Sequence, residues 1–263
     1  MDLSITGAKV YFAIKTPWFD INITQTTISI LAVTVLLITL AYFIGRKITK
    51  RPGRFQVIVE KLITMLYGMV ESTMGKHNLK FAPYIGTLFL SSTIGTLIGM
   101  TGVFRSVTAD LSVTLAWALV TTGIVWYSNI KNFGFKAWLK GFTEPIVIMT
   151  PMNIVSEIAQ PLSLAFRHFG NVAGGSVLTT LIYATLALLS NVIFGWLPEA
   201  ILACFPPVLT AGIPAFLSIY FDLFSGFVQA LVFSLLTMVY IGEANPPLAE
   251  SETQDETAIE TKK

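Results

Sequence analysis

Long uncharged runs alternate with short basic clusters along this chain, and the pattern predicts membrane-crossing helices. Residues 27–45 (TISILAVTVLLITLAYFIG) have about the length that a helix needs to cross roughly 30 Å of hydrocarbon. The next runs cover 83–104 and 107–128, and the short join at Arg105 predicts an antiparallel hairpin. Two longer apolar stretches, about 146–197 and 201–241, exceed one perpendicular crossing, which predicts tilted helices. We therefore expect an all-α polytopic membrane protein with about five crossings.

An amphipathic segment lies between the first two runs. From 55 to 75 apolar residues recur at helical spacing, while Glu60, Lys61 and Glu71 interrupt them, which favours an interfacial helix over a span. Between the two long stretches lie the break LPEA and a kink-capable FPP at 205–207. The predicted parts are an extracytoplasmic segment (1–26), a first transmembrane helix (27–45), a basic loop with the interfacial helix (46–82), a transmembrane hairpin (83–128), a basic cytoplasmic loop (129–145), a long tilted hairpin (146–241) and an acidic disordered tail (242–263).

Basic residues set the expected orientation. They follow the first and third runs, at Arg46, Lys47, Lys50, Arg51 and Arg54 and again at Lys131, Lys136 and Lys140. Because basic loops stay in the cytoplasm, we expect the N-terminus outside and, after five crossings, the C-terminus inside. The N-terminal segment has the pattern of neither a signal peptide nor an organelle transit peptide, which favours a bacterial plasma membrane.

Composition excludes a soluble protein. The chain has 263 residues, of which 54% are hydrophobic and 12% charged, and its mean hydropathy is +0.71, too apolar for a globule in water. The balance of 17 basic and 15 acidic residues does not predict a nucleic-acid partner, and we predict no cofactor and no metal site. No internal repeat is visible, which weighs against the inverted-repeat secondary transporters.

The candidate chemistry centres on a cation inside an apolar run, in PLSLAFRHFGNVAGG at 161–175. Arg167 lies mid-segment, and an ionisable group at that depth is by default a functional candidate. Residues three or four positions apart form one polar, small-residue stripe with it, comprising Gln160, Ser163, Gly170, Asn171 and Gly174. The last long helix carries a matching stripe of Ser218, Asp222, Ser225, Gly226 and Gln229. The two stripes predict a hydrophilic surface within the membrane, kept low by glycines for the close passage of another helix.

Each signal also has a structural explanation. The polar and small residues would serve as packing between helices. Asp222 would neutralise Arg167 in a salt bridge, because a charge at the membrane centre costs roughly 2.5 to 3.5 kcal/mol. His168 is rotated about 100° from the stripe, which favours a packed or hydrogen-bonded histidine over a proton relay. Asp110 begins a helix, where it or Thr108 would act as N-cap, and this role competes with a place on an ion path.

The segment PLSLAFRHFGN closely resembles the signature P-L-S-L-x-L-R-L-F-G-N of the a subunit of F-type ATP synthases, the membrane stator beside a rotating ring of c subunits. YIGTLFL, TADLSVTLAWAL, SEIAQ and DLFSGFVQALVFSLLTMVYI follow the same order, so that the resemblance covers about residues 45–241. It implies long tilted helices that embrace the ring, peripheral-stalk b subunits as further partners, and no ATP chemistry in this chain. It also implies Arg167 as the stator arginine, with Asn171 beside it and Gln229 facing it.

The chain departs from the family pattern at four positions. Ser176 stands nine residues after the arginine, where Glu or His is usual, and Asp222 stands seven residues before Gln229, where His or Glu is common. His168 replaces an apolar residue, and Asn153 stands where many members have an acid. These departures leave the detailed ion path open.

The resemblance implies translocation of H⁺ or Na⁺ through two half-channels. We expect Asp222 and Ser176, with Glu157, to line one of them and Asp110 the other. Ser176 lies about 180° from Arg167 around the helix, and is expected to point into the space between helices. A ring carboxylate crosses lipid in neutral form, and at about 4 Å in an effective dielectric of about 20 Arg167 would favour its ionised form by roughly 4 kcal/mol. The alternatives are a self-contained ion channel or small permease, in which Arg167 and Asp222 line a pore, and a structural scaffold in which they pair.

Overall fold

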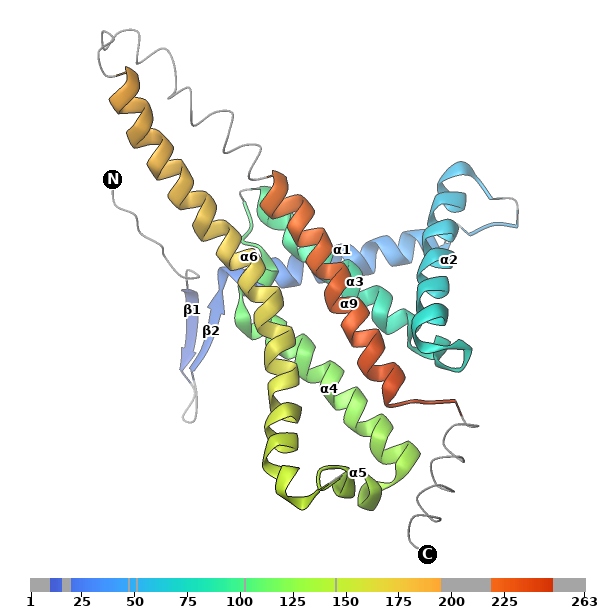
Figure 1. Ribbon diagram of the computed structural model, residues 1–263. Coiled ribbons are helices and arrows are strands. Elements are labelled where there is room, and N and C mark those ends of the chain that lie inside the picture. Colours follow the sequence, from blue (N-terminus) through green and yellow to red (C-terminus); the bar gives the residue numbers. More distant parts are fainter. Residues whose placement is uncertain are drawn as a thin grey trace, which may run out of the picture. The chain divides into compact units, whose positions relative to one another are not determined.

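The computed structural model describes residues 10–15, 20–46, 48–50, 52–101, 103–144, 146–194 and 219–247. Within these ranges five helices are long and apolar enough to cross a membrane, so the predicted polytopic helical fold is confirmed (Figure 1). The predicted LPEA break, the FPP kink and Ser218 lie outside the described residues. So do 1–9 and 16–19 of the predicted extracytoplasmic segment and 248–263 of the predicted tail.

The described chain begins with a β-hairpin that the sequence pattern did not predict. Strand β1 (Val10–Lys15) pairs antiparallel with β2 (Asp20–Thr24), so that Val10 lies opposite Thr24 and Lys15 opposite Asp20. Aromatic and β-branched residues in both segments favour the extended backbone. Helix α1 (Gln25–Arg46) follows β2 directly and covers the predicted first span.

Helix α2 (Arg54–Met74) occupies the predicted interfacial segment and is followed by a turn at Gly75, whose φ of 81° favours glycine. The chain continues through η1 (Lys76–Phe81), α3 (Ala82–Leu97) and η2 (Ile98–Thr101). Among the described helices α2 is not one of the five candidate spans, whereas the η1–α3–η2 segment is.

Helix α3 and the next long helix run antiparallel, as the hairpin prediction requires. After η3 (Val107–Ala109), α4 covers Leu111–Phe133. The Tyr84 hydroxyl lies 2.9 Å from the Thr121 hydroxyl, and the Thr96 hydroxyl lies 2.9 Å from that of Thr108. The join is longer than a single residue at Arg105, because helical structure ends at Thr101 and α4 begins at Leu111. A short helix α5 (Phe135–Gly141) lies in the basic loop.

Helix α6 is much longer than a bilayer crossing requires. After η4 (Val147–Met149) it covers Thr150–Phe194, 45 residues with Pro161 inside, which is about 67 Å of helical rise. The chain is described again from a π-helical segment, η5 (Ile219–Ser225), which leads into α9 (Gly226–Glu243). Of the predicted stretch 201–241, the part before residue 219 lies outside the described residues.

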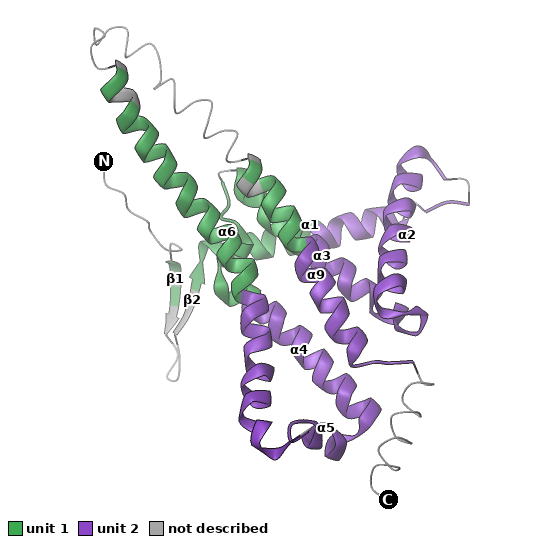
Figure 2. Ribbon diagram, in the orientation of Figure 1, with its two compact units in different colours: residues 1–36, 91–114, 166–230 green, residues 37–90, 115–165, 231–263 purple. Residues whose placement is uncertain are grey.

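The chain forms two compact units, and each long helix except α2 contributes residues to both (Figure 2). Unit 1 comprises residues 1–36, 91–114 and 166–230, and unit 2 comprises 37–90, 115–165 and 231–263. Arg167 and its neighbours on α6 belong to unit 1.

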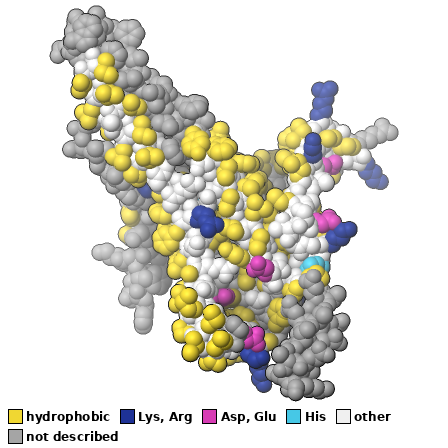
Figure 3. Space-filling model, viewed as in Figure 1, with side chains coloured by type: hydrophobic (Ala, Val, Ile, Leu, Met, Phe, Trp, Pro, Cys, Tyr) yellow, Lys and Arg dark blue, Asp and Glu magenta, His cyan; other side chains and the backbone are white. Residues whose placement is uncertain are grey.

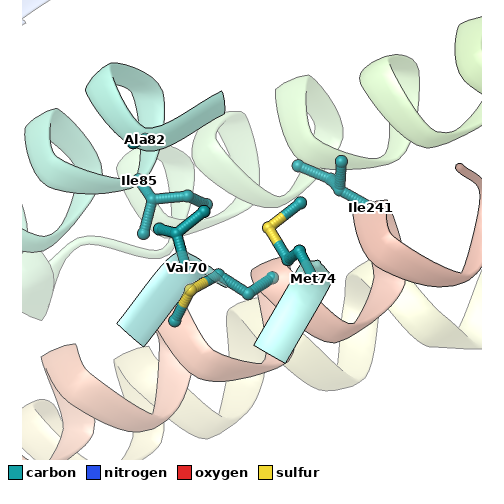
Figure 4. Close-up of a cluster of buried hydrophobic side chains, with 6 residues drawn as sticks. Val70, Met74, Ala82, Ile85 and Ile241 are labelled. Carbon is teal, nitrogen blue, oxygen red and sulfur yellow. The ribbon is translucent and has the colours of Figure 1, made fainter. Parts of the chain in front are cut away.

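Unit 2 contains a cluster of buried hydrophobic side chains from three helices (Figure 4). Val70 and Met74 of α2 pack against Ala82 and Ile85 of α3 and against Met238 and Ile241 of α9, all at most 4% exposed. The last turns of α2 are therefore part of the protein core. The sequence predicted an amphipathic interfacial helix here, and the structure adds that its last turns pack against α3 and α9.

Within unit 2, hydrogen bonds of asparagine side chains join the end of α9 to α4 and to η1. The Asn132 side-chain amide donates to the Ala244 carbonyl (2.8 Å) and to Asn245 Oδ1 (3.0 Å). The Asn78 amide donates to the Asn245 carbonyl at 2.9 Å. These bonds satisfy carbonyls that a helix C-terminus leaves without intrahelical partners.

Candidate functional site

The stripe on α6 lies on the surface of the described chain. Ser163, Arg167 and Asn171, with Gly170 and Gly174, are exposed, and Gln160 is half-buried. Large hydrophobic residues on the same helix, such as Ile158, Phe166 and Leu178, are exposed as well. Figure 3 shows this face of the molecule covered mainly by hydrophobic and uncharged atoms. A guanidinium therefore projects from a surface whose composition suits lipid.

Arg167 forms no ion pair with any side chain that the structure describes; the ion pairs found there join Lys76 to Glu71 and Lys140 to Glu144. Asp222 lies in η5, and its side chain is outside the description, so its predicted pairing with Arg167 stays a hypothesis. A shallow hollow follows α6 next to the arginine, lined by Phe169, Gly170, Ala173, Gly174, Val177, Leu178 and Leu181. The two glycines give this surface its low relief.

The opposite side of α6 is buried. His168, at 0% exposure, and Val172 are buried in unit 1, and Leu164 and Ala165 are buried in unit 2. The His168 ring hydrogen-bonds the Ser92 hydroxyl of α3 through Nε2 at 2.9 Å, and the backbone of Gln229 in α9 lies beside the ring. The packed, hydrogen-bonded histidine favoured by the sequence is confirmed.

Two members of the predicted stripe on α9 face inward instead of outward. A Cβ at Gly226 would lie 2.5 Å from Thr96 Cγ2, so the glycine allows α9 to approach α3 of the same chain. Gln229 is only 6% exposed. The glycine predicted to allow the close passage of another helix does so here for α3 of the same chain, because its open side is filled by Thr96.

Asn171 joins α6 to the last helix. Its amide donates to Gln229 Oε1 at 3.4 Å, and its oxygen accepts from the half-buried Ser225 hydroxyl at 3.0 Å. Gln229 thus contacts the residue one turn after Arg167, and no described hydrogen bond or ion pair joins Gln229 to Arg167 itself.

Asp110 caps α4, as one of the two sequence interpretations proposed. Its Oδ1 accepts from the Ser112 backbone N–H at 3.0 Å, and its Oδ2 accepts from the Thr26 hydroxyl at 2.7 Å. The Thr108 hydroxyl, close to Asp110 in the chain, lies 2.9 Å from that of Thr96 and 3.0 Å from that of Ser106. The half-buried Asp110 carboxylate and the hydroxyl groups of Thr26, Thr96, Ser106 and Thr108 therefore lie near the join of α3 and α4.

Glu157 and Ser176, which the sequence predicts to line one half-channel with Asp222, lie in different units. They are nineteen residues apart on α6, which is about 28 Å of helical rise. Glu157 belongs to unit 2, where its carboxylate accepts from Trp126 Nε1, whereas Ser176, Asp110 and the backbone of Asp222 belong to unit 1. Ser176 is also exposed, not enclosed between described helices, and its hydroxyl donates to the Ala173 carbonyl at 2.8 Å.

The sequence interpretation missed several polar partners, namely Thr26, Ser92, Thr96 and Trp126. For Ser92 and Thr96 the sequence did contain a signal, a Ser/Thr-rich stretch in the predicted second span, SSTIGT at 91–96. The two residues are four positions apart there and share a helix face. Among the described residues, no group of three His, Cys, Asp or Glu side chains is placed to hold a metal ion.

Comparison with known proteins agrees with this arrangement. Residues 26–242 match the family model described as ATP synthase A chain. The chain is 34% identical to the ATP synthase subunit a, sodium ion specific, of Propionigenium modestum, over 85% of this chain and 74% of that protein. It is 31% identical to ATP synthase subunit a 1 of Crocosphaera subtropica, over 85% and 88%. It is 32% identical to ATP synthase subunit a of Albidiferax ferrireducens, over 82% and 81%.

Proposed function

We propose, from the premise that this chain belongs to the ATP synthase A chain family, that Arg167 is the fixed charge in its ion-translocation step. The chain is the membrane stator subunit of an ATP synthase and takes part in ion translocation. We propose specific residues, a partner chain and a route for this ion translocation.

The observation that supports this role is the exposed position of Arg167 on an apolar surface. The arginine has no ion pair to a described side chain, and a hollow lined in part by glycines lies beside it. A fixed cation in lipid needs an anion, and the exposed position admits one from another chain. We propose that the partner is the ring of c subunits, whose helices pass along the hollow at Gly170 and Gly174. Ser163, Gln160 and Asn171 continue the same contact surface.

The arginine acts by electrostatics. A ring carboxylate must be neutral in lipid, so it carries a proton or a bound Na⁺ there. At about 4 Å from Arg167 and an effective dielectric of about 20, the ionised form gains roughly 4 kcal/mol, equivalent to about three pKa units. The ion is released on one side of the arginine and replaced on the other. A guanidinium suits this role better than an ammonium group, because it stays charged when it is desolvated.

We propose that different polar residues line the paths to the two sides of the membrane. Asp110, bonded to Thr26 at the start of α1, is proposed to line the extracytoplasmic path, because the basic loops predict that α1 starts outside. Ser176 and Asp222 are proposed to serve that same path. Glu157 follows the basic loop at the start of α6 and is proposed to line the cytoplasmic path with Trp126.

The remaining assignments follow from the family. We propose a bacterial plasma membrane, an outer N-terminus and a cytoplasmic C-terminus, peripheral-stalk b subunits as further partners, and no catalysis of ATP chemistry by this chain itself. The cargo is H⁺ or Na⁺. The Propionigenium modestum relative is named as sodium ion specific, and hydroxyl and carboxylate oxygens of the kind gathered at Asp110 suit either ion.

The test uses the complete ATP synthase in proteoliposomes, with ATP-driven uptake of H⁺ and of ²²Na⁺ as readouts. Arg167→Gln is expected to abolish both, and Arg167→Lys to reduce coupled uptake at least about tenfold, since a desolvated lysine loses its proton. Arg105→Gln, which also removes one arginine, is the matched control and should keep parental uptake. Full coupled activity in Arg167→Lys would favour the scaffold, and conductance by the chain without the ring would favour the self-contained channel.

A further inference from the structure

The residue after the arginine holds an unusual position. His168 is fully buried, whereas Arg167 beside it is exposed. Consecutive residues of a helix project about 100° apart. Whatever fixes the direction of His168 therefore also fixes the direction of Arg167.

Three helices meet at the His168 ring. The ring belongs to α6, its Nε2 hydrogen-bonds the Ser92 hydroxyl of α3 at 2.9 Å, and the backbone of Gln229 in α9 lies beside it. One turn away, Asn171 of α6 bonds the Gln229 and Ser225 side chains of α9. The third pair of helices, α9 and α3, come close at Gly226, which lies against Thr96 of α3.

We infer that His168 is a positioning residue, which sets the rotation of α6 about its axis so that Arg167 faces outward toward the moving acid. The inference rests on the proposed role of Arg167. An imidazole suits this joint because it is large enough to fill the space between helices and carries a ring nitrogen that meets the Ser92 hydroxyl. In lipid, polar contacts of this kind specify which faces of two helices meet, since apolar burial alone does not distinguish one rotation from another.

A proton-relay role for His168 fits the contacts less well. Beyond the Ser92 hydroxyl, the chain of hydrogen bonds continues through the Ser92 carbonyl, which accepts from the Thr96 hydroxyl at 2.9 Å. A carbonyl oxygen has no proton to pass on. The described path from His168 toward Thr108 is therefore interrupted for proton transfer at Ser92.

The experiment is a double-mutant cycle on Ser92 and His168 in the complete, reconstituted ATP synthase. His168→Leu and Ser92→Ala are each expected to lower ATP-driven ion uptake about three- to tenfold, at an unchanged amount of assembled complex. The double variant should be no worse than the worse single variant, because both changes break the same joint. His168→Gln keeps polar atoms at the ring position and should stay within about threefold of the parent, with the same pH profile.

Several outcomes would overturn the inference. Parental uptake in His168→Leu would show that no positioning is needed, and strictly additive losses would show that the two residues act independently. An uptake in His168→Gln as low as in His168→Leu, or a displaced pH profile, would establish the relay instead. Should His168→Leu fail to assemble, the uptake of Ser92→Ala, which removes only one oxygen atom, tests the joint, and parental uptake in that variant would overturn it.

The two proposals fail in different ways. Coupling between positions 92 and 168 in the melting temperature of the complex, together with full activity of Arg167→Lys, would refute the role of Arg167 and leave the joint intact. An essential Arg167 without coupling between the two positions would refute the joint alone.

Discussion

Units 1 and 2 are built from parts of the same helices but are held together by different contacts. In unit 2, six apolar side chains from α2, α3 and α9 form a buried cluster, and hydrogen bonds of asparagine side chains join the end of α9 to α4 and to η1. In unit 1, the hydrogen bonds described between distant segments involve hydroxyl, amide, imidazole and carboxylate groups, as at Thr26–Asp110 and Ser92–His168.

The difference follows from what each unit has to do. Apolar packing holds helices firmly and leaves no room for water. Polar joints fix helix orientation and also leave oxygen and nitrogen atoms near a path that an ion has to use. We therefore expect unit 2 to respond to lost volume, and unit 1 to respond to lost hydrogen bonds and to added volume at its glycine contact.

The largest expected effect is in the unit 2 cluster. Ile241→Ala removes a side chain that is 0% exposed, and the cavity left behind should cost about 3 kcal/mol of stability. The measurement is the heat stability of the purified full-length chain in lipid nanodiscs. Val239→Ala is the matched control on the same helix, since Val239 is 39% exposed. Equal losses in the two variants would contradict the cluster as the main support of unit 2.

A smaller loss is expected from added volume in unit 1. In Gly226→Ala the new methyl group would lie 2.5 Å from Thr96 Cγ2, and the helices must separate at a cost of about 2 kcal/mol. Gly174→Ala is the control: no atom lies within 4 Å of its Cβ position, and alanine favours a helix by about 1 kcal/mol over glycine. In the same heat-stability measurement, a Gly226→Ala chain as stable as Gly174→Ala would refute the close contact of α9 with α3.

The smallest effect is expected where one hydroxyl group is lost. Thr26→Val keeps the shape of the side chain but removes the 2.7 Å bond to Asp110 and the 2.8 Å bond to the Thr24 hydroxyl, which together should cost about 1 kcal/mol. Thr34→Val on the same helix provides the comparison, because that hydroxyl bonds only the Ile30 carbonyl one turn back among the described contacts. Indistinguishable heat stabilities of Thr26→Val and Thr34→Val would show that the Asp110 contact adds nothing to unit 1.

The fold was largely accessible from the sequence, whereas the site was accessible only in part. The run at 27–45 predicted α1 because uncharged length alone decides whether a helix can cross lipid. The β-hairpin at 10–24 was not predicted, since short segments of mixed polarity give no clear period. Arg167 was identified by its depth in an apolar run, but the partners of His168 come from positions 76 residues earlier and 61 residues later in the chain.

Helical spacing determined which residues form the candidate stripe. The length of the uncharged runs determined the number of long apolar helices and the depth of the cation in its run. Only the tertiary structure decided that Gly226 and Gln229 turn inward, and that Asp110 shares a unit with Ser176 while Glu157 lies in the other. The physical reason is that a period of 3.6 residues tells which side chains share a face of one helix. It carries no information about which neighbouring helix, or which part of the surroundings, covers that face.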